Sequence, residues 1–151
     1  MNQETVKSYV EKMCLEIGTT EQAVWDANNK AWYFVRGSIS IEVFLNTYEL
    51  SDKSTRTFLR VFSPIFKLPE SAKQLELLQG AIEANAQFMG VKIGTMADKG
   101  WMYAISERDI IGMDYAEFVT VINDLGYWAD KLDDFLQERF GYVNATTAAT
   151  V

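Results

Sequence analysis

The sequence predicts an α+β domain in which helices pack on one face of an antiparallel sheet. Apolar residues recur every three to four positions in three segments, which indicates amphipathic helices. In several shorter segments they alternate with polar residues between turn signals, which indicates antiparallel strands. A chain of 151 residues can bury one sizeable core. We expect one domain over residues 1–141 and a flexible tail over residues 142–151.

The first half of the chain predicts one helix and then a run of strands. Residues 4–17 have helical apolar spacing, and Gly18 is expected to end that helix. In SISIEVFLNTYEL the apolar residues alternate with polar ones, except that Phe44 and Tyr48 place aromatic rings among the polar positions. Strands are expected at residues 23–25, 31–37, 38–50 and 57–68.

The second half predicts a helix, a hairpin and a long closing helix. The helix at 69–88 begins with Pro69, which suits a first helical turn, and its sequence places Leu75, Leu78 and Ile82 on one side. Two strands, GVKIGTM and WMYAISE, flank the turn ADKG. Asp114 is expected to cap the last helix.

That last helix is predicted over residues 115–140, with Gly141 ending it. The sheet would then hold about five strands, in the order α-β-β-β-α-β-β-α, because short turns join neighbouring strands in antiparallel sheets. All helices are expected on one of its faces.

The stretch TFLRVFSPIFKL has large apolar side chains on both faces of a single predicted strand. One set of alternate residues is mainly aliphatic and the other is aromatic. Three exposed phenylalanines would forgo about 5–9 kcal/mol of burial, at roughly 1.5–3 kcal/mol each. An uncovered patch of this kind marks an interaction site. We therefore expect a second chain or a partner to cover these interface candidates: Phe44, Tyr48, Phe58, Arg60, Phe62 and Phe66.

Pro64, within the same strand, leaves a second interpretation open. Proline cannot donate a hydrogen bond to a neighbouring strand, so it belongs at a sheet edge or at a bulge. A bulge near Ser63 and Pro64 would shift the alternation of the strand and return some aromatic side chains to the core.

The composition excludes several classes of function. The net charge of −7 and the scattered basic residues argue against nucleic acid as a partner. The absence of histidine and the single cysteine remove Ser-His and Cys-His nucleophiles and the common zinc sites. Neither a signal peptide nor a run of 18 apolar residues is present, so we expect a cytoplasmic protein that makes no membrane contact.

No catalytic, cofactor-binding or metal-binding residue is predicted. Chemistry without histidine would have to use carboxylates or tyrosines. An enzyme or small-ligand binder would need Glu107 or Asp109 to lie beside Tyr103 in one pocket.

Three runs in the chain resemble the YbjN-like family of bacterial sensory transduction regulators. They are WYFVRGSISIEVFLNTYE, TFLRVFSPIFKLPE, and ANAQFMGVKIGTMADKGWMYAISERDIIGMDYAEF, which includes Asn85 ahead of the hairpin. The resemblance also takes in ADKLDDFL of the long helix and extends over about residues 4 to 141. It implies a type III secretion chaperone-like fold that is often dimeric and has no established enzyme activity.

Together the residues and the resemblance predict a non-enzymatic protein-interaction module, a sensory transduction regulator that is homodimeric. It would bind protein segments through the aromatic sheet face or through a sheet edge. One alternative is a chaperone for secreted client proteins. The other is the carboxylate- and tyrosine-based ligand binder or enzyme.

Overall fold

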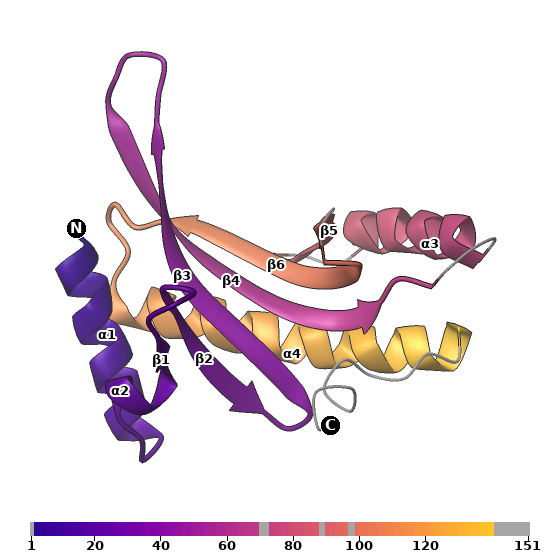
Figure 1. Ribbon diagram of the computed structural model, residues 1–151, viewed down its shortest axis with the longest axis horizontal. Helices are drawn as coiled ribbons and strands as arrows, with labels where there is room; N and C mark the ends of the chain where they lie inside the picture. The colour runs from indigo at the N-terminus through magenta and orange to yellow at the C-terminus, as the bar shows by residue number, and fades with distance from the viewer. Residues whose placement is uncertain (1, 70–72, 88–89, 97–98, 141–151) are drawn as a thin grey trace.

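Six antiparallel strands form one sheet in the order β1-β2-β3-β4-β6-β5 (Figure 1). The computed structural model describes residues 2–69, 73–87, 90–96 and 99–140. The helices are α1 (Gln3–Glu16), α2 (Glu21–Val24), α3 (Lys73–Gln87) and α4 (Tyr115–Phe140). The strands are β1 (Trp25–Asp26), β2 (Ala31–Arg36), β3 (Ile39–Glu49), β4 (Thr55–Lys67), β5 (Lys92–Met96) and β6 (Trp101–Asp109).

The larger helices, α1, α3 and α4, pack on the same face of the sheet, as predicted. Figure 1 shows α4 running behind the central strands, with α1 beside its start and α3 beside β5. One core cluster joins buried side chains of these three helices to one face of the strands. Among the described helices, none is long and apolar enough to cross a membrane.

The chain enters the sheet through two short elements that differ from the prediction. Gly18, with φ of 76°, ends α1: its N–H bonds the carbonyl of Leu15 and the next N–H bonds that of Cys14. The strand expected at residues 23–25 is wrong in its bounds. The Thr20 hydroxyl accepts from the Ala23 N–H at 3.3 Å and starts the one-turn helix α2, so β1 begins only at Trp25.

A bulge in β4 explains how this strand can carry large apolar side chains on both faces. Its register against β6 shifts between Pro64 and Phe66, and Ile65 is the extra residue. The shift turns Phe66 to the helix-covered face, where it joins the core at 1% exposure. Phe62 precedes the bulge and keeps the opposite orientation, across from Ile105 of β6.

α3 packs with a different side from the one predicted. The buried side holds Leu77, Ala81 and Ala84, whereas Leu75 and Ile82 are 76% and 71% exposed. The helix is described from Lys73 to Gln87, and the residues between Pro69 and Lys73, where the predicted start falls, lie outside the described residues. The predicted side was wrong because it left out Leu77, which is fully buried together with the small alanines.

α4 begins as predicted, at Tyr115 after Asp114. The Asp114 carboxylate accepts from the Glu117 N–H at 2.8 Å. Glu117 in turn accepts from Arg108 of β6 at 2.5 Å, which ties the first turn of the helix to the sheet. The predicted stop at Gly141 and the predicted tail over residues 142–151 lie outside the described residues.

Asp114→Ala tests this cap. Loss of one charge-assisted cap costs about 1 kcal/mol, which lowers Tm by about 2–4 °C for a chain of this size. Calorimetry measures the shift, and Asp130→Ala, on an exposed part of α4, is the control that should stay within about 0.5 kcal/mol. Equal effects of the two substitutions would contradict the capping role.

Candidate functional site

The face of the sheet opposite the larger helices, called the open face below, is where the sequence predicted an interaction surface. Pairing places alternate residues of β3, β4 and β6 on it in cross-strand rows. Glu42 lies opposite Phe62, which lies opposite Ile105; Phe44 lies opposite Arg60, which lies opposite Glu107. The further rows pair Asn46 with Phe58 and Tyr48 with Arg56.

At the centre of the open face, neighbouring aromatic rings and an arginine shield Phe62 from solvent. Phe62 lies 5.2 Å from Phe44 and 6.0 Å from Tyr103, measured between ring centroids. The guanidinium carbon of Arg60 lies 4.7 Å from the Phe62 ring centroid and 5.6 Å from that of Phe44. Phe62 is therefore fully buried, without any helix above it.

A tyrosine–glutamate pair borders this cluster on the β2 side. The Tyr33 hydroxyl donates to Glu42 at 3.0 Å. Burial, and then the hydrogen bond and charge of Glu42, raise the pKa of Tyr33 to about 12. The hydrogen bond joins β2 to β3, where Tyr33 and Glu42 lie opposite one another.

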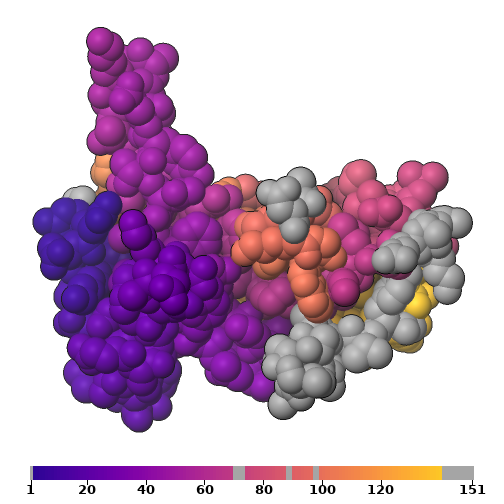
Figure 2. All heavy atoms as spheres, in the orientation of Figure 1, coloured from indigo at the N-terminus to yellow at the C-terminus, as the bar shows by residue number. Residues whose placement is uncertain are grey.

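The end of the β3–β4 hairpin, residues 47–57, is called the arm below. It projects from the body of the molecule (Figure 1), and Figure 2 shows a hollow beside it. Tyr48 and Phe58 meet edge to face at 5.9 Å, and Arg56 lies over the Phe58 ring at 5.5 Å. Tyr48 remains 44% exposed, and Leu50 at the start of the turn is also exposed.

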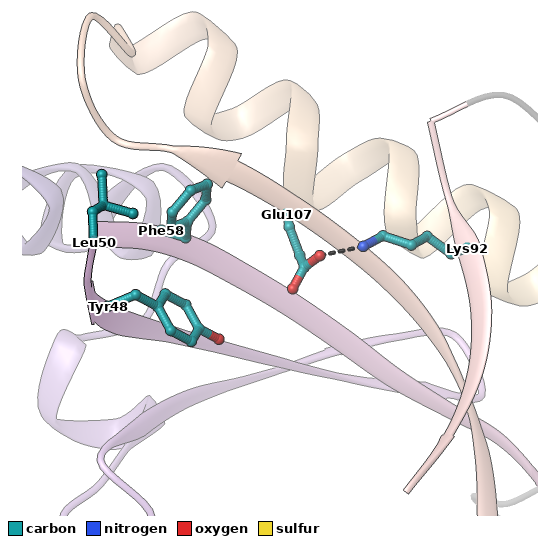
Figure 3. Close-up of a pocket in the computed structure, with 5 residues that line it drawn as sticks. All are labelled: Tyr48, Leu50, Phe58, Lys92 and Glu107. Carbon is teal, nitrogen blue, oxygen red and sulfur yellow. Dashed lines mark hydrogen bonds and ion pairs between the residues drawn. The ribbon is translucent and has the colours of Figure 1, made fainter. Parts of the chain in front are cut away.

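A groove of about 490 Å³ runs from the arm to β5. Figure 3 shows its two sides: the arm presents apolar and aromatic side chains, and Glu107 of β6 points toward Lys92 of β5. The residues that line it are Tyr48, Leu50, Phe58, Lys92 and Glu107.

Ion pairs hold the charged residues in the groove and beside it. Glu107 accepts from Arg60 at 2.7 Å and also from Lys92. The hydrogen bond from Lys92, aided by the charge of Arg60, lowers the pKa of Glu107. Asp109 accepts from the Ile111 N–H at 2.9 Å and from Arg56, which together lower its pKa, with the backbone hydrogen bond first.

The six interface candidates separate into three groups. Phe66 is a core residue and Phe62 is covered by its own chain, so the expectation that a partner must cover these two is wrong. The bulge accounts for Phe66, and the overlying rings and Arg60 account for Phe62. The other four lie on the open face, and their role as an interface stays a prediction: Tyr48 is exposed, and Phe44, Phe58 and Arg60 are half-buried.

Sequence reasoning missed Leu50 and Lys92. Leu50 lies at the start of a turn, so it belongs to no helical or strand pattern of apolar residues. Lys92 reaches the groove because β6 lies between β4 and β5 in the sheet, an order that local patterns do not contain. The alternation of β5 did contain one usable signal: it placed Lys92 and Ile93 on opposite faces.

The free edge of β5 is partly closed by α3. The Asn85 amide donates to the Ile93 carbonyl at 3.0 Å and accepts from the Ile93 N–H at 2.6 Å. The side chain thus satisfies both backbone groups as a neighbouring strand would. An added strand would have to displace this residue, which disfavours the edge as the main binding surface.

The arrangement needed for carboxylate and tyrosine chemistry does not form. Neither Tyr103 nor Asp109 lines the groove that contains Glu107. Tyr103 is buried, which together with Glu42 raises its pKa. Within the described ranges, no three metal-ligating side chains come together.

Comparison with solved structures identifies the fold. A chain of the "Crystal Structure of the ExsC-ExsE Complex" superposes with a TM-score of 0.62 at 10% identity, over 91% of this chain and 96% of that one. A chain of the "Structure of the HopA1-SchA Chaperone-Effector Complex" gives 0.59 at 11% identity, over 85% and 93%. No protein-family model and no curated protein sequence matches the chain. The chain therefore has an α+β fold of the type III secretion chaperone kind.

Phe62→Ala distinguishes a self-covered residue from an open contact. Removing a fully buried phenylalanine should lower the free energy of unfolding by about 3–5 kcal/mol in urea titrations, because a cavity remains under Arg60. Tyr48→Ala, on the exposed arm, should cost less than about 1 kcal/mol. A small loss for Phe62→Ala would mean that this side chain is not packed as described.

Proposed function

We propose that the protein is a non-enzymatic protein-binding module that holds an extended segment of a partner in the groove between the arm and β5. The observation that supports this best is the exposed surface of Tyr48 and Leu50, with the half-buried Phe58, along the groove. Exposed aromatic side chains next to a concavity are typical anchors of protein interfaces.

The fold adds support of a coarser kind. One of the two similar structures is named a chaperone–effector complex, so this architecture accommodates a protein partner there. The finer assignments are a chaperone for secreted clients and a YbjN-like sensory transduction regulator acting in the cytoplasm. The first has the fold in its favour, and the second rests on the sequence resemblance alone.

A peptide library tests the groove even though the partner is unidentified. Random 12-residue peptides displayed on phage should yield apolar binders of the wild-type protein, and fluorescence anisotropy with synthetic copies gives their Kd. Tyr48→Asp should weaken this binding about tenfold or more, because it places a charge in the apolar side of the groove.

Tyr127→Asp is the matched control, since Tyr127 is a similarly exposed tyrosine on α4. It should leave the Kd unchanged. Failure to select any peptide, or equal binding by the Tyr48→Asp and wild-type proteins, would contradict the proposal.

A second proposal, homodimerisation, is favoured by the exposed side of α3. Leu75 and Ile82 lie about two turns apart on that helix and are exposed. A cavity of about 200 Å³ between α3 and β5 continues the apolar surface. Unpaired aliphatic side chains in such an array fit the helix of a second copy. This surface is distinct from the groove, so a dimer would leave the groove free.

Sedimentation equilibrium tests the dimer. Wild-type protein at micromolar concentration should have twice the mass of one chain, and Ile82→Asp should be monomeric with an unchanged circular dichroism spectrum. Ile111→Asp, at an exposed isoleucine between β6 and α4, should stay dimeric. A wild-type monomer, or a dimer that persists in Ile82→Asp, would rule out the α3 interface.

A further inference from the structure

At one end of the groove, cations outnumber carboxylates. At the β5 end, the one carboxylate of Glu107 is shared by two cations, Arg60 and Lys92. This local group keeps one unit of positive charge, although the chain as a whole has a net charge of −7. A binding segment therefore meets a local group of charges here whose sum is opposite in sign to the net charge of the molecule.

Lys92, the cation at this end, is also more exposed than the carboxylate with which it pairs. The Lys92 side chain is 61% exposed, against 26% for Glu107 and 22% for Arg60. A lysine ammonium has three N–H donors, and the bond to Glu107 uses one of them. Figure 3 shows the lysine reaching Glu107 from the β5 side of the groove. The ammonium can donate to a second carboxylate without giving up the first.

At the arm, too, the cation is more exposed than the carboxylate with which it pairs. Asp109 is nearly covered, with 9% of its side chain exposed, while Arg56, which pairs with it, is 46% exposed. Asp109 is satisfied from below by the Ile111 N–H and from the side by Arg56. Both ends of the open face thus turn a cation outward and keep the carboxylate beneath it.

The register fixes the separation of the two cations. Lys92 lies opposite Ile105, Asp109 lies opposite Phe58, and Arg56 is two residues beyond Phe58 along β4. The backbone offset is six residue steps, but both side chains reach β6: Lys92 bonds Glu107 and Arg56 bonds Asp109. These two carboxylates are two residues apart on the same face of β6, or about 7 Å at roughly 3.3 Å per residue. The apolar side chains lie on the arm side, where Tyr48 lies opposite Arg56 and Phe58 lies under its guanidinium.

We propose that the segment bound in the groove carries two carboxylates about two residues apart, followed by apolar residues. One carboxylate pairs with Lys92 and the other with Arg56, and the apolar residues contact Tyr48 and Phe58. This inference rests on the proposed function, and it adds the chemistry of the partner. Charge steers such a segment to the groove, while the acidic remainder of the protein repels it elsewhere.

Three synthetic peptides test the inference by fluorescence anisotropy at low salt. They are Asp-Ala-Asp-Leu-Phe-Val-Ile, the same sequence with Asn at both Asp positions, and the same with Lys at both Asp positions. The Asp peptide should bind about fivefold more tightly than the Asn peptide, and the Lys peptide should bind least. The preference should fade at about 0.5 M salt, because screening removes the contribution of exposed ion pairs.

Two variants test whether Lys92 causes the preference for the Asp peptide. Lys92→Glu should reverse it in favour of the Lys peptide, and Lys92→Gln, which avoids a new charge, should reduce it to about twofold or less. Lys131→Glu, at an exposed lysine of α4, is the matched control and should keep the wild-type order of affinities. Circular dichroism confirms that each variant is folded.

The outcomes separate the two proposals. If the Asn peptide binds as tightly as the Asp peptide, and Tyr48→Asp abolishes both, the acidic preference is wrong and the groove stands. A preference for Asp that survives Lys92→Glu also overturns the inference. If no peptide binds and the library yields none, both proposals fall together.

Discussion

The structure depends on the bulge that divides β4 between two surfaces. Before it, Phe58 and Phe62 point to the open face; after it, Phe66 points into the core under the helices. Pro64 is tolerated because it sits at this irregularity, where a regular ladder is already interrupted. One strand can therefore complete the core at one end and supply a binding face at the other.

The open face hides most of its aromatic surface with polar residues of its own chain. The Arg60 guanidinium covers Phe44 and Phe62, and its charge is held by Glu107. This cover ends toward the arm, where the hairpin projects from the body of the molecule (Figure 1). What remains accessible is small, apolar and flanked by cations, which suits a short segment better than a broad flat interface.

Much of the fold follows from local patterns, and the parts that do not have definite causes. Alternation placed Phe44 and Tyr48 on the polar side of β3, and the structure has them there. After the bulge Phe66 pairs with Met102 of β6 and joins the same core cluster, a contact between residues distant in sequence. The buried side of α3 likewise faces a core that is built from strands distant in sequence. The groove was beyond local patterns for the same reason, since Lys92 enters it only through strand order.

Hydrogen–deuterium exchange of the protein with a library-selected peptide tests the central claim, that the groove between the arm and β5 is a protein-binding surface. The account predicts slower amide exchange, on peptide addition, in residues 47–58 and 92–96, with little change in α1 and the start of β2. Protection confined to α1 and β2, or no protection of the arm by a peptide that demonstrably binds, would contradict it.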